Sequence, residues 1–239
     1  MGYSIIADMH MHTIASSHAY GTVKEMAEAA QSAGLCAIAI TDHGPGMEDA
    51  PHPWHFDNMT TLPREIAGVR VFRGIEANIL NAAGETDLED VRKERMEWVV
   101  ASFHPPVAGL HMTEEECTNA WLGVIQNPHI DMMGHSGDPR YRYDYERVIR
   151  EAAHSGTVVE INNGSFKVRA GSYENCKTIA LLCKKYGAYI SVDSDAHTPW
   201  RVAALDEALQ MLNEVNFPSE LIVNADFNRL LKYMENRRK

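Results

Sequence analysis

The sequence predicts an α/β protein, and within that class a barrel of seven parallel strands. Short apolar runs rich in Val, Ile and Ala alternate with amphipathic helical patterns along the whole chain. The runs lack strict polar alternation, which is typical of strands buried on both faces of a parallel sheet. A doubly wound sheet would show the same alternation. We favour the barrel, because a chain of 239 residues has the usual size of about 200–250 residues for that fold.

Seven segments are the expected strands. Each is short, apolar and followed by polar or small residues. In chain order they are Ile5–Met9, Leu35–Thr41, Val69–Ile75, Trp98–Phe103, Ile130–Met133, Thr157–Ile161 and Ala188–Val192.

The helices expected between these strands begin at capping signals and end at glycine or proline. Two of them start at a capping box, in which a threonine precedes a glutamate by three residues: Thr22 with Glu25, and Thr113 with Glu116. Gly34 would end the first of these helices. A third helix is expected from about Ser172 to the stop at Gly187, a fourth over residues 205–212 before Pro218, and a last one over about 228–236.

The chain is expected to form one domain over residues 1–239, because no linker or change of composition divides it. The longest irregular stretch, Gly44–Pro63, holds four prolines together with Trp54 and Phe56. A loop of this length in a compact domain often has a function.

Charge and composition exclude several classes of protein. With 22 Lys+Arg against 33 Asp+Glu, the net charge is −11, which makes nucleic acid an unlikely partner and argues against anionic membranes. No apolar run approaches the about 18 residues that a membrane helix needs, and we see no signal peptide. A cytoplasmic protein is expected, with its four cysteines as reduced thiols in the core.

Histidine is the most unusual residue of the chain, with 12 copies, and many of them follow expected strands. Parallel α/β folds build their active sites at the carboxyl ends of the strands, where these side chains would lie. The histidines and carboxylates at these ends are His10, His12, His43, Glu76, His104, His135, Asp195 and His197.

The spacing within these motifs suits a metal centre. Residues i and i+2 of an extended strand point to the same side, so His10 and His12 can reach one ion, as can Asp195 and His197. In a closed barrel the first and last strands are neighbours, which brings the two pairs together. Imidazoles combined with carboxylates favour zinc, manganese or iron over calcium or magnesium. Glu76 has two oxygens and is the natural candidate to bridge two ions.

The other histidines have simpler interpretations. Four of them are expected in loops or on helix surfaces, without a role in the site: His52, His111, His129 and His154. His55 stays ambiguous, because it lies in the aromatic part of the long irregular stretch.

In combination, these motifs resemble the PHP (polymerase and histidinol phosphatase) superfamily, and especially its YcdX-type trinuclear zinc phosphatases. The matching segments stand at residues 8–13, 40–44, 74–76, 103–104, 134–135 and 194–197, with further likeness at 47–56 and 160–163. The resemblance covers nearly the whole chain. It implies a distorted, TIM-like (β/α)7 barrel.

The resemblance also implies three divalent ions, with zinc favoured and manganese or iron as alternatives. One ion would be held by His10, His12, Glu76 and Asp195, a second by His18, His43 and His197, and a third by Glu76, His104 and His135. The residues alone do not single out His18; the family pattern adds it.

The expected activity is metal-dependent hydrolysis of the phosphate monoester of a small substrate. A hydroxide that bridges two of the ions would attack phosphorus, without a phosphoenzyme. We assign Glu76, Asp195 and His197 to catalysis, and Arg169 and Arg201 to the binding of the phosphoryl oxygens. Asp42 could orient a ligand imidazole or cap a turn.

Several alternatives stay open. The enzyme could be a histidinol-phosphate phosphatase or a small nuclease of the same superfamily, and the basic end at Arg237, Arg238 and Lys239 is a weak sign of the latter. A non-catalytic metal-binding domain is a further possibility. An amidohydrolase on a similar barrel is disfavoured. Its metal site would commonly be bridged by a modified lysine, whereas here no lysine stands at a strand end and Glu76 occupies the bridging position. The protein could also form a homo-oligomer.

Overall fold

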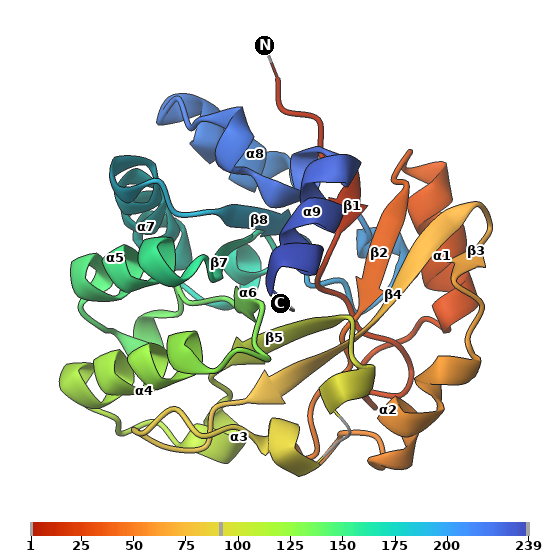
Figure 1. Ribbon diagram of the computed structural model, residues 1–239, viewed down its shortest axis with the longest axis horizontal. Coiled ribbons are helices and arrows are strands. Elements are labelled where there is room, and N and C mark those ends of the chain that lie inside the picture. The colour runs from red at the N-terminus through yellow and green to blue at the C-terminus, as the bar shows by residue number, and fades with distance from the viewer. Residues whose placement is uncertain (1, 91–92, 238–239) are drawn as a thin grey trace.

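Seven parallel strands form a nearly closed barrel in the computed structural model, which describes residues 2–90 and 93–237 (Figure 1). The sheet order is β1-β2-β4-β5-β6-β7-β8, so that each strand pairs with the next one along the barrel. The expected barrel is therefore confirmed. The parallel strands are β1 (Ala7–Asp8), β2 (Ala37–Ile40), β4 (Val69–Asn78), β5 (Trp98–Ser102), β6 (Met132–Met133), β7 (Val158–Asn162) and β8 (Ile190–Asp193).

Each expected strand overlaps an observed one, but most of the expected bounds were too wide. The largest extension is that of β4, which continues past the expected end at Ile75 to Asn78 and so includes Glu76. β7 and β8 each continue one residue past their expected ends. A further short strand, β3 (Glu65–Ile66), pairs antiparallel with the start of β4. The two residues between them, Ala67 and Gly68, both have positive φ, as a tight hairpin turn requires. This turn was not predicted, because alanine is not a typical residue for it.

The helices with capping signals are confirmed. Both capping boxes form, at α1 (Val23–Ser32) and α4 (Glu114–Gln126), and Gly187 ends α7 (Ser172–Tyr186) in a left-handed conformation. The last two expected helices are α8 (Asp206–Glu214) and α9 (Phe227–Arg237). The helices that were not individually predicted are α2 (Trp54–Asn58), α3 (Pro105–Ala108), α5 (Tyr145–Ser155) and α6 (Ser165–Val168).

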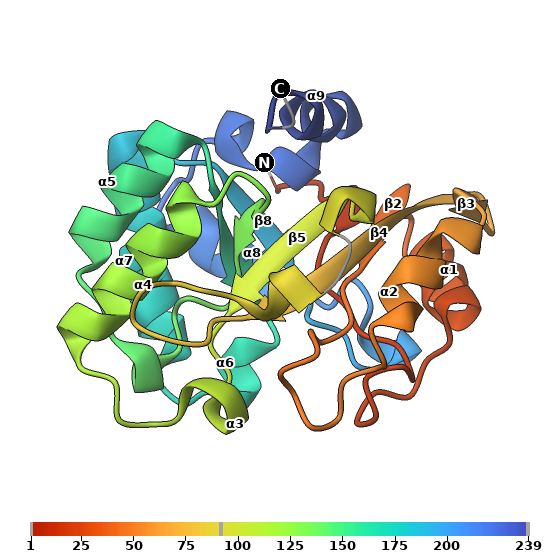
Figure 2. The same ribbon diagram turned by 60° about the horizontal axis from the view of Figure 1, so that its bottom comes forward.

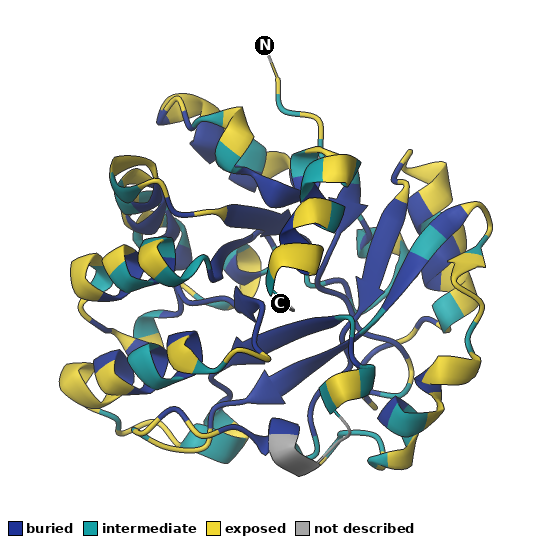
Figure 3. Ribbon diagram, viewed as in Figure 1, coloured by how far each residue is buried: buried dark blue, intermediate teal, exposed yellow. Residues whose placement is uncertain are grey.

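The seven parallel strands are largely buried and the outer faces of the helices are exposed (Figure 3). Two views show α4, α5 and α7 along one side of the barrel, and α1 and α2 along the other (Figures 1 and 2). Cys117, Cys176 and Cys183 are buried free thiols, as expected, but Cys36 is exposed, so its assignment to the core was wrong. Within the described residues, no helix has both the length and the apolar character needed to cross a bilayer.

The barrel is closed between β1 and β8 mainly by side chains. The carboxylate of Asp8 accepts hydrogen bonds from the backbone and hydroxyl of Ser194, and the carboxylate of Asp193 accepts one from Met9 N at 2.7 Å. Closer to the start of the strands, the buried Asn224 side chain accepts from Val192 N at 3.1 Å and donates to Ala7 O at 2.9 Å. Asn224 therefore takes the place of a strand-to-strand ladder at this seam.

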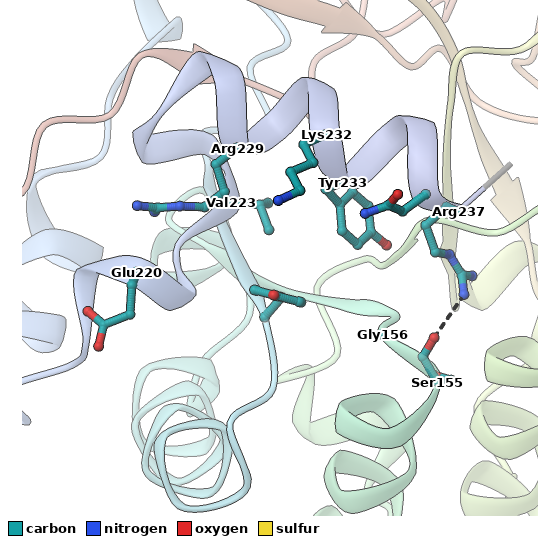
Figure 4. A pocket seen from close by; sticks show the side chains of 10 residues that line it. Ser155, Gly156, Glu220, Val223, Arg229, Lys232, Tyr233 and Arg237 are labelled. Carbon is teal, nitrogen blue, oxygen red and sulfur yellow. Dashed lines mark hydrogen bonds between the residues drawn. The ribbon is translucent and has the colours of Figure 1, made fainter. Parts of the chain in front are cut away.

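Helix α9 covers the amino-terminal end of the barrel, opposite α3 and α6 (Figure 2). A hollow of about 390 Å³ lies beneath α9, and Arg237 beside it donates to Ser155 O (Figure 4). Arg237 also donates to Ile130 O. This arginine therefore binds backbone carbonyls far from the strands' carboxyl ends, while Arg238 and Lys239 lie outside the described residues. The described part of the basic end thus gives no support to a nuclease.

Candidate metal centre

The carboxyl ends of six strands and one long loop bring the nine expected ligands together. His10 and His12 follow β1, His43 follows β2, and Glu76 lies near the end of β4. The remaining strands contribute through the residues that follow them: His104 after β5, His135 after β6, and Asp195 and His197 after β8. His18 comes from the loop between β1 and α1.

Glu76 is the centre of this cluster. Its Oε1 lies 3.3 Å from His10 Nε2, 3.4 Å from His104 Nε2 and 2.9 Å from His135 Nε2. Its Oε2 lies 3.5 Å from His12 Nε2 and 2.9 Å from His43 Nδ1. Two oxygens that face five imidazoles on both sides are the arrangement expected of a bridging carboxylate.

Asp195 forms the second acidic part of the cluster. Its Oδ1 lies 3.2 Å from His12 Nε2, 3.7 Å from His10 Nε2 and 3.6 Å from His197 Nδ1. The two pairs that flank the barrel seam therefore meet, as their spacing predicted. Asp195 has a φ of 53°, and His135 has a φ of 26°. A positive φ is uncommon for residues other than glycine, and such backbone is often found at functional sites.

His18 completes the cluster on its outer side. Its ring centroid lies 4.6 Å from that of His197 and 5.2 Å from that of His43. Its Nδ1 contacts a carboxylate oxygen of Asp49. With its side chain half exposed, His18 lies where the site opens to solvent, and the structure places it with the other eight residues.

The donor atoms fit divalent ions. Buried nitrogens of His10, His12 and His43, and Oε2 of Glu76, have no hydrogen-bond partner among residues 2–90 and 93–237. Buried polar atoms without partners are costly, and ion coordination would satisfy them. Three groups of side chains have ligand atoms within 4.8 Å of one another: His12, His43 and His197; His10, His12 and Glu76; and His43, Glu76 and His104.

The two carboxylates and two of the imidazoles in the cluster have pKa shifts that favour their metal-binding forms. Burial would raise the pKa of Glu76, but His104 and His10 hold it well below its usual range, and His10 likewise lowers the pKa of Asp195 against the effect of burial. Both carboxylates therefore stay ionised. Burial lowers the pKa of His12 to about 3 and that of His104 to about 4. Both imidazoles are neutral near pH 7, which is the form that binds metal.

A surrounding set of side chains orients the ligand imidazoles. Glu160 on β7 accepts from His10 Nδ1 at 2.8 Å and from His135 N. Asn78 Oδ1 accepts from His104 Nδ1 at 2.7 Å, and Asp87 accepts from the amide of Asn78. These contacts direct Nε2 of His10 and of His104 into the cluster.

The roles of Glu160, Asn78 and Asp87 were not predicted from the sequence. The signal for Glu160 was present, because it is a charged residue inside an otherwise apolar strand. Such a residue is seldom fully buried unless it is paired. Asn78 and Asp87 gave no comparable signal, since their partners are far away along the chain.

Asp42 and His55 contact each other at the turn that follows β1. Asp42 accepts hydrogen bonds from Thr13 N, Thr13 Oγ1 and Ser16 Oγ, so it holds the turn after β1 rather than one of the nine ligands. His55 Nε2 lies 3.3 Å from Asp42 Oδ2, which places His55 behind that turn. The four histidines without an expected role, His52, His111, His129 and His154, are all exposed.

A hollow of about 430 Å³ lies against the cluster, with His18, Asp195 and His197 in its lining. Arg169 and Arg201, the two arginines expected to bind substrate, line the same hollow. The Arg169 side chain is 12% exposed, with Nη1 lying 3.6 Å from Asp195 Oδ2. This arginine is therefore fixed beside the cluster and is not a solvated surface residue.

Replacing Glu160 by glutamine is expected to weaken metal binding by about 10- to 100-fold, the usual effect of losing such an orienting partner. A glutamine has a single side-chain acceptor, so it cannot serve both His10 Nδ1 and His135 N. Titration against a chromophoric chelator would measure the change. Glu174→Gln, at an exposed position on α7, is the control, and equal affinities for the two variants would contradict the role given to Glu160.

The chain is similar to a known domain family, to proteins named as probable phosphatases and to a solved phosphatase structure. A family model described as the PHP domain matches residues 8–186. A "Probable phosphatase" of Acetivibrio thermocellus is 41% identical over 98% of this chain and 96% of its own length, and "Probable phosphatase YcdX" of Escherichia coli O81 is 41% identical over 96% and 94%. The structure of histidinol phosphate phosphatase from Lactococcus lactis, solved with zinc, L-histidinol and phosphate, superimposes on this chain with a TM-score of 0.66. It is 20% identical, covering 89% of this chain and 94% of that one.

Proposed function

Because this chain belongs to the PHP domain family, we propose that it hydrolyses phosphate monoesters at a centre of three divalent ions. At the coarser level the chain is a phosphoric ester hydrolase, like its relatives. The observation that carries the finer proposal is the position of Glu76, whose two oxygens lie 2.9–3.5 Å from imidazole nitrogens of five histidines. A single ion would leave several of these donors unused.

The nine side chains divide into three ligand sets, two of which share Glu76. His10, His12, Glu76 and Asp195 would hold one ion; His18, His43 and His197 a second; and Glu76, His104 and His135 a third. The group of His10, His12 and Glu76 described above lies within the first set and supports it. The other two groups each combine residues of two sets, because His12 also lies close to His43 and His197, and His43 to Glu76 and His104. The mixture of imidazoles and carboxylates favours zinc, with manganese or iron as alternatives.

When bound, the ions would activate water as the nucleophile and would neutralise charge on the phosphoryl group. The protein's own part is to hold the reacting groups in place. Glu76, Asp195 and His197 hold the ligand cluster beside the hollow, and Arg169 and Arg201 line the hollow. Their guanidinium groups suit the phosphoryl oxygens, which they can bind with paired hydrogen bonds. The substrate is a small phosphorylated molecule, matched to a hollow of about 430 Å³.

Removal of the metal is expected to abolish the activity. Purified protein should contain several equivalents of zinc, manganese or iron and should hydrolyse an aryl phosphate. Chelation should reduce the rate by at least about 100-fold, because the ions provide several kcal/mol of stabilisation in the transition state. Elemental analysis and the recovery of activity on adding back each metal measure this. Full activity in metal-free protein would contradict the proposal.

A further inference from the structure

We propose that the natural substrate carries a second anionic group, a carboxylate or a phosphate, in the part that leaves as the alcohol, and that Lys167 binds this group. The inference rests on the proposed function, because it concerns the same hollow beside the metal centre. It goes further by naming the chemistry of the leaving group.

The charges that line the hollow are unequal. Three residues of its lining have cationic side chains: Lys167, Arg169 and Arg201. The lining contains one carboxylate, Asp195, and this carboxylate belongs to the metal cluster. The excess of positive charge is local, because the chain as a whole has a net charge of −11.

The arginines have different surroundings from Lys167. Arg169 is held towards the cluster by Asp195 at 3.6 Å, by Asp138 at 3.4 Å and by Ser165 Oγ at 2.8 Å. It is therefore placed for the phosphoryl group. Arg201 has no carboxylate within ion-pair distance in the described part of the chain, and it lines the hollow together with Arg169.

Lys167 remains available for another group. Its side chain is 53% exposed, and its Nζ lies 3.9 Å from Glu207 Oε1, which is itself 49% exposed. An ion pair this long and this exposed contributes little, so an anionic ligand can compete for the ammonium group. Glu207 does not line the hollow.

This distribution of charge selects among leaving groups. A phosphoryl dianion is matched by the ions and the two arginines, so Lys167 is an additional positive charge. A substrate with a carboxylate or a second phosphate would complement it. A substrate with an ammonium group, such as histidinol phosphate, would bring a like charge to a lining that offers no carboxylate beyond Asp195, which disfavours it.

Three monoesters of similar size test this inference: 3-phosphoglycerate, glycerol 3-phosphate and phosphoethanolamine. Their leaving groups are anionic, neutral and cationic. With the metal-loaded protein we expect kcat/KM to fall in that order, with steps of about fivefold, the effect of one partly screened ion pair. Equal values for the three, or the reverse order, would overturn the proposal.

Variants then assign the effect to Lys167. Lys167→Met should bring the ratio of 3-phosphoglycerate to glycerol 3-phosphate close to one, and Lys167→Glu should turn the preference towards phosphoethanolamine. Glu207→Gln, which frees Lys167, should increase the ratio. Lys24→Met, at a lysine 75% exposed on α1, is the control and should keep the wild-type ratio. An unchanged ratio in both Lys167 variants would overturn the role of this lysine.

Failure of the inference can be told apart from failure of the proposed function. If the protein is not a metal-dependent phosphatase, the metal-loaded form hydrolyses neither an aryl phosphate nor any of the three monoesters. If only the inference fails, the aryl phosphate is hydrolysed and the order of the three monoesters does not follow charge.

Discussion

Replacing Glu76 by alanine is expected to reduce phosphatase activity by about 10³-fold or more, together with the loss of bound metal. Glu76 is 1% exposed, and its two oxygens face imidazoles that come from four other strands. Without this carboxylate, two of the three proposed ion sites lose a ligand at the same time. The ions that remain would also repel one another more strongly, because the negative charge of the shared carboxylate is gone.

The measurement combines elemental analysis with initial rates on an aryl phosphate at saturating zinc. Glu76→Gln is a useful second variant, because it keeps the shape of the side chain but loses its charge; it should also lose metal. Glu65→Ala, at an exposed position on β3, is the control. If Glu76→Ala kept both its metal content and its rate, a shared ligand at this position would be ruled out.

Replacing Asn224 by alanine is expected to lower the free energy of unfolding by about 3 kcal/mol or more, and to weaken metal binding as a consequence. Asn224 is fully buried at the seam of the barrel. Its amide nitrogen lies 2.9 Å from both Ala7 O and Val192 O, and its Oδ1 accepts from Val192 N at 3.1 Å. Alanine would leave these groups buried without partners, and each such group costs about 1–3 kcal/mol.

The effect on metal binding follows from the place of the seam. β1 leads to His10 and His12, and β8 leads to Asp195 and His197. A looser seam therefore separates the two halves of one ligand set. Urea unfolding at a fixed zinc concentration measures stability, and chelator titration measures affinity. Asn213→Ala, at an exposed position on α8, should change stability by less than about 0.5 kcal/mol. A similarly small effect at Asn224 would contradict the proposed closure.

The sequence predicted those features that depend on neighbouring residues. The capping boxes at Thr22 and Thr113 form because donor and acceptor are three residues apart. Helices α2, α3 and α6 gave no such signal, because segments of four or five residues are too short to show a helical period. The burial of Cys36 was predicted wrongly, since an apolar run does not reveal which of its residues faces outward.

The sequence alone was enough to predict the order of the seven parallel strands and of five helices, and the kinds of ligand that stand at the strand ends. Parallel strands connected by helices must place their carboxyl ends together, so His10, His43 and Glu76 had to lie at one end of the barrel. The tertiary structure alone decided how the barrel closes and which side chains support the ligands. Asn224 reaches Ala7 across 217 residues, and Glu160 reaches His10 across 150. Contacts of that separation depend on the packing of the whole chain, and no local pattern of residues encodes them.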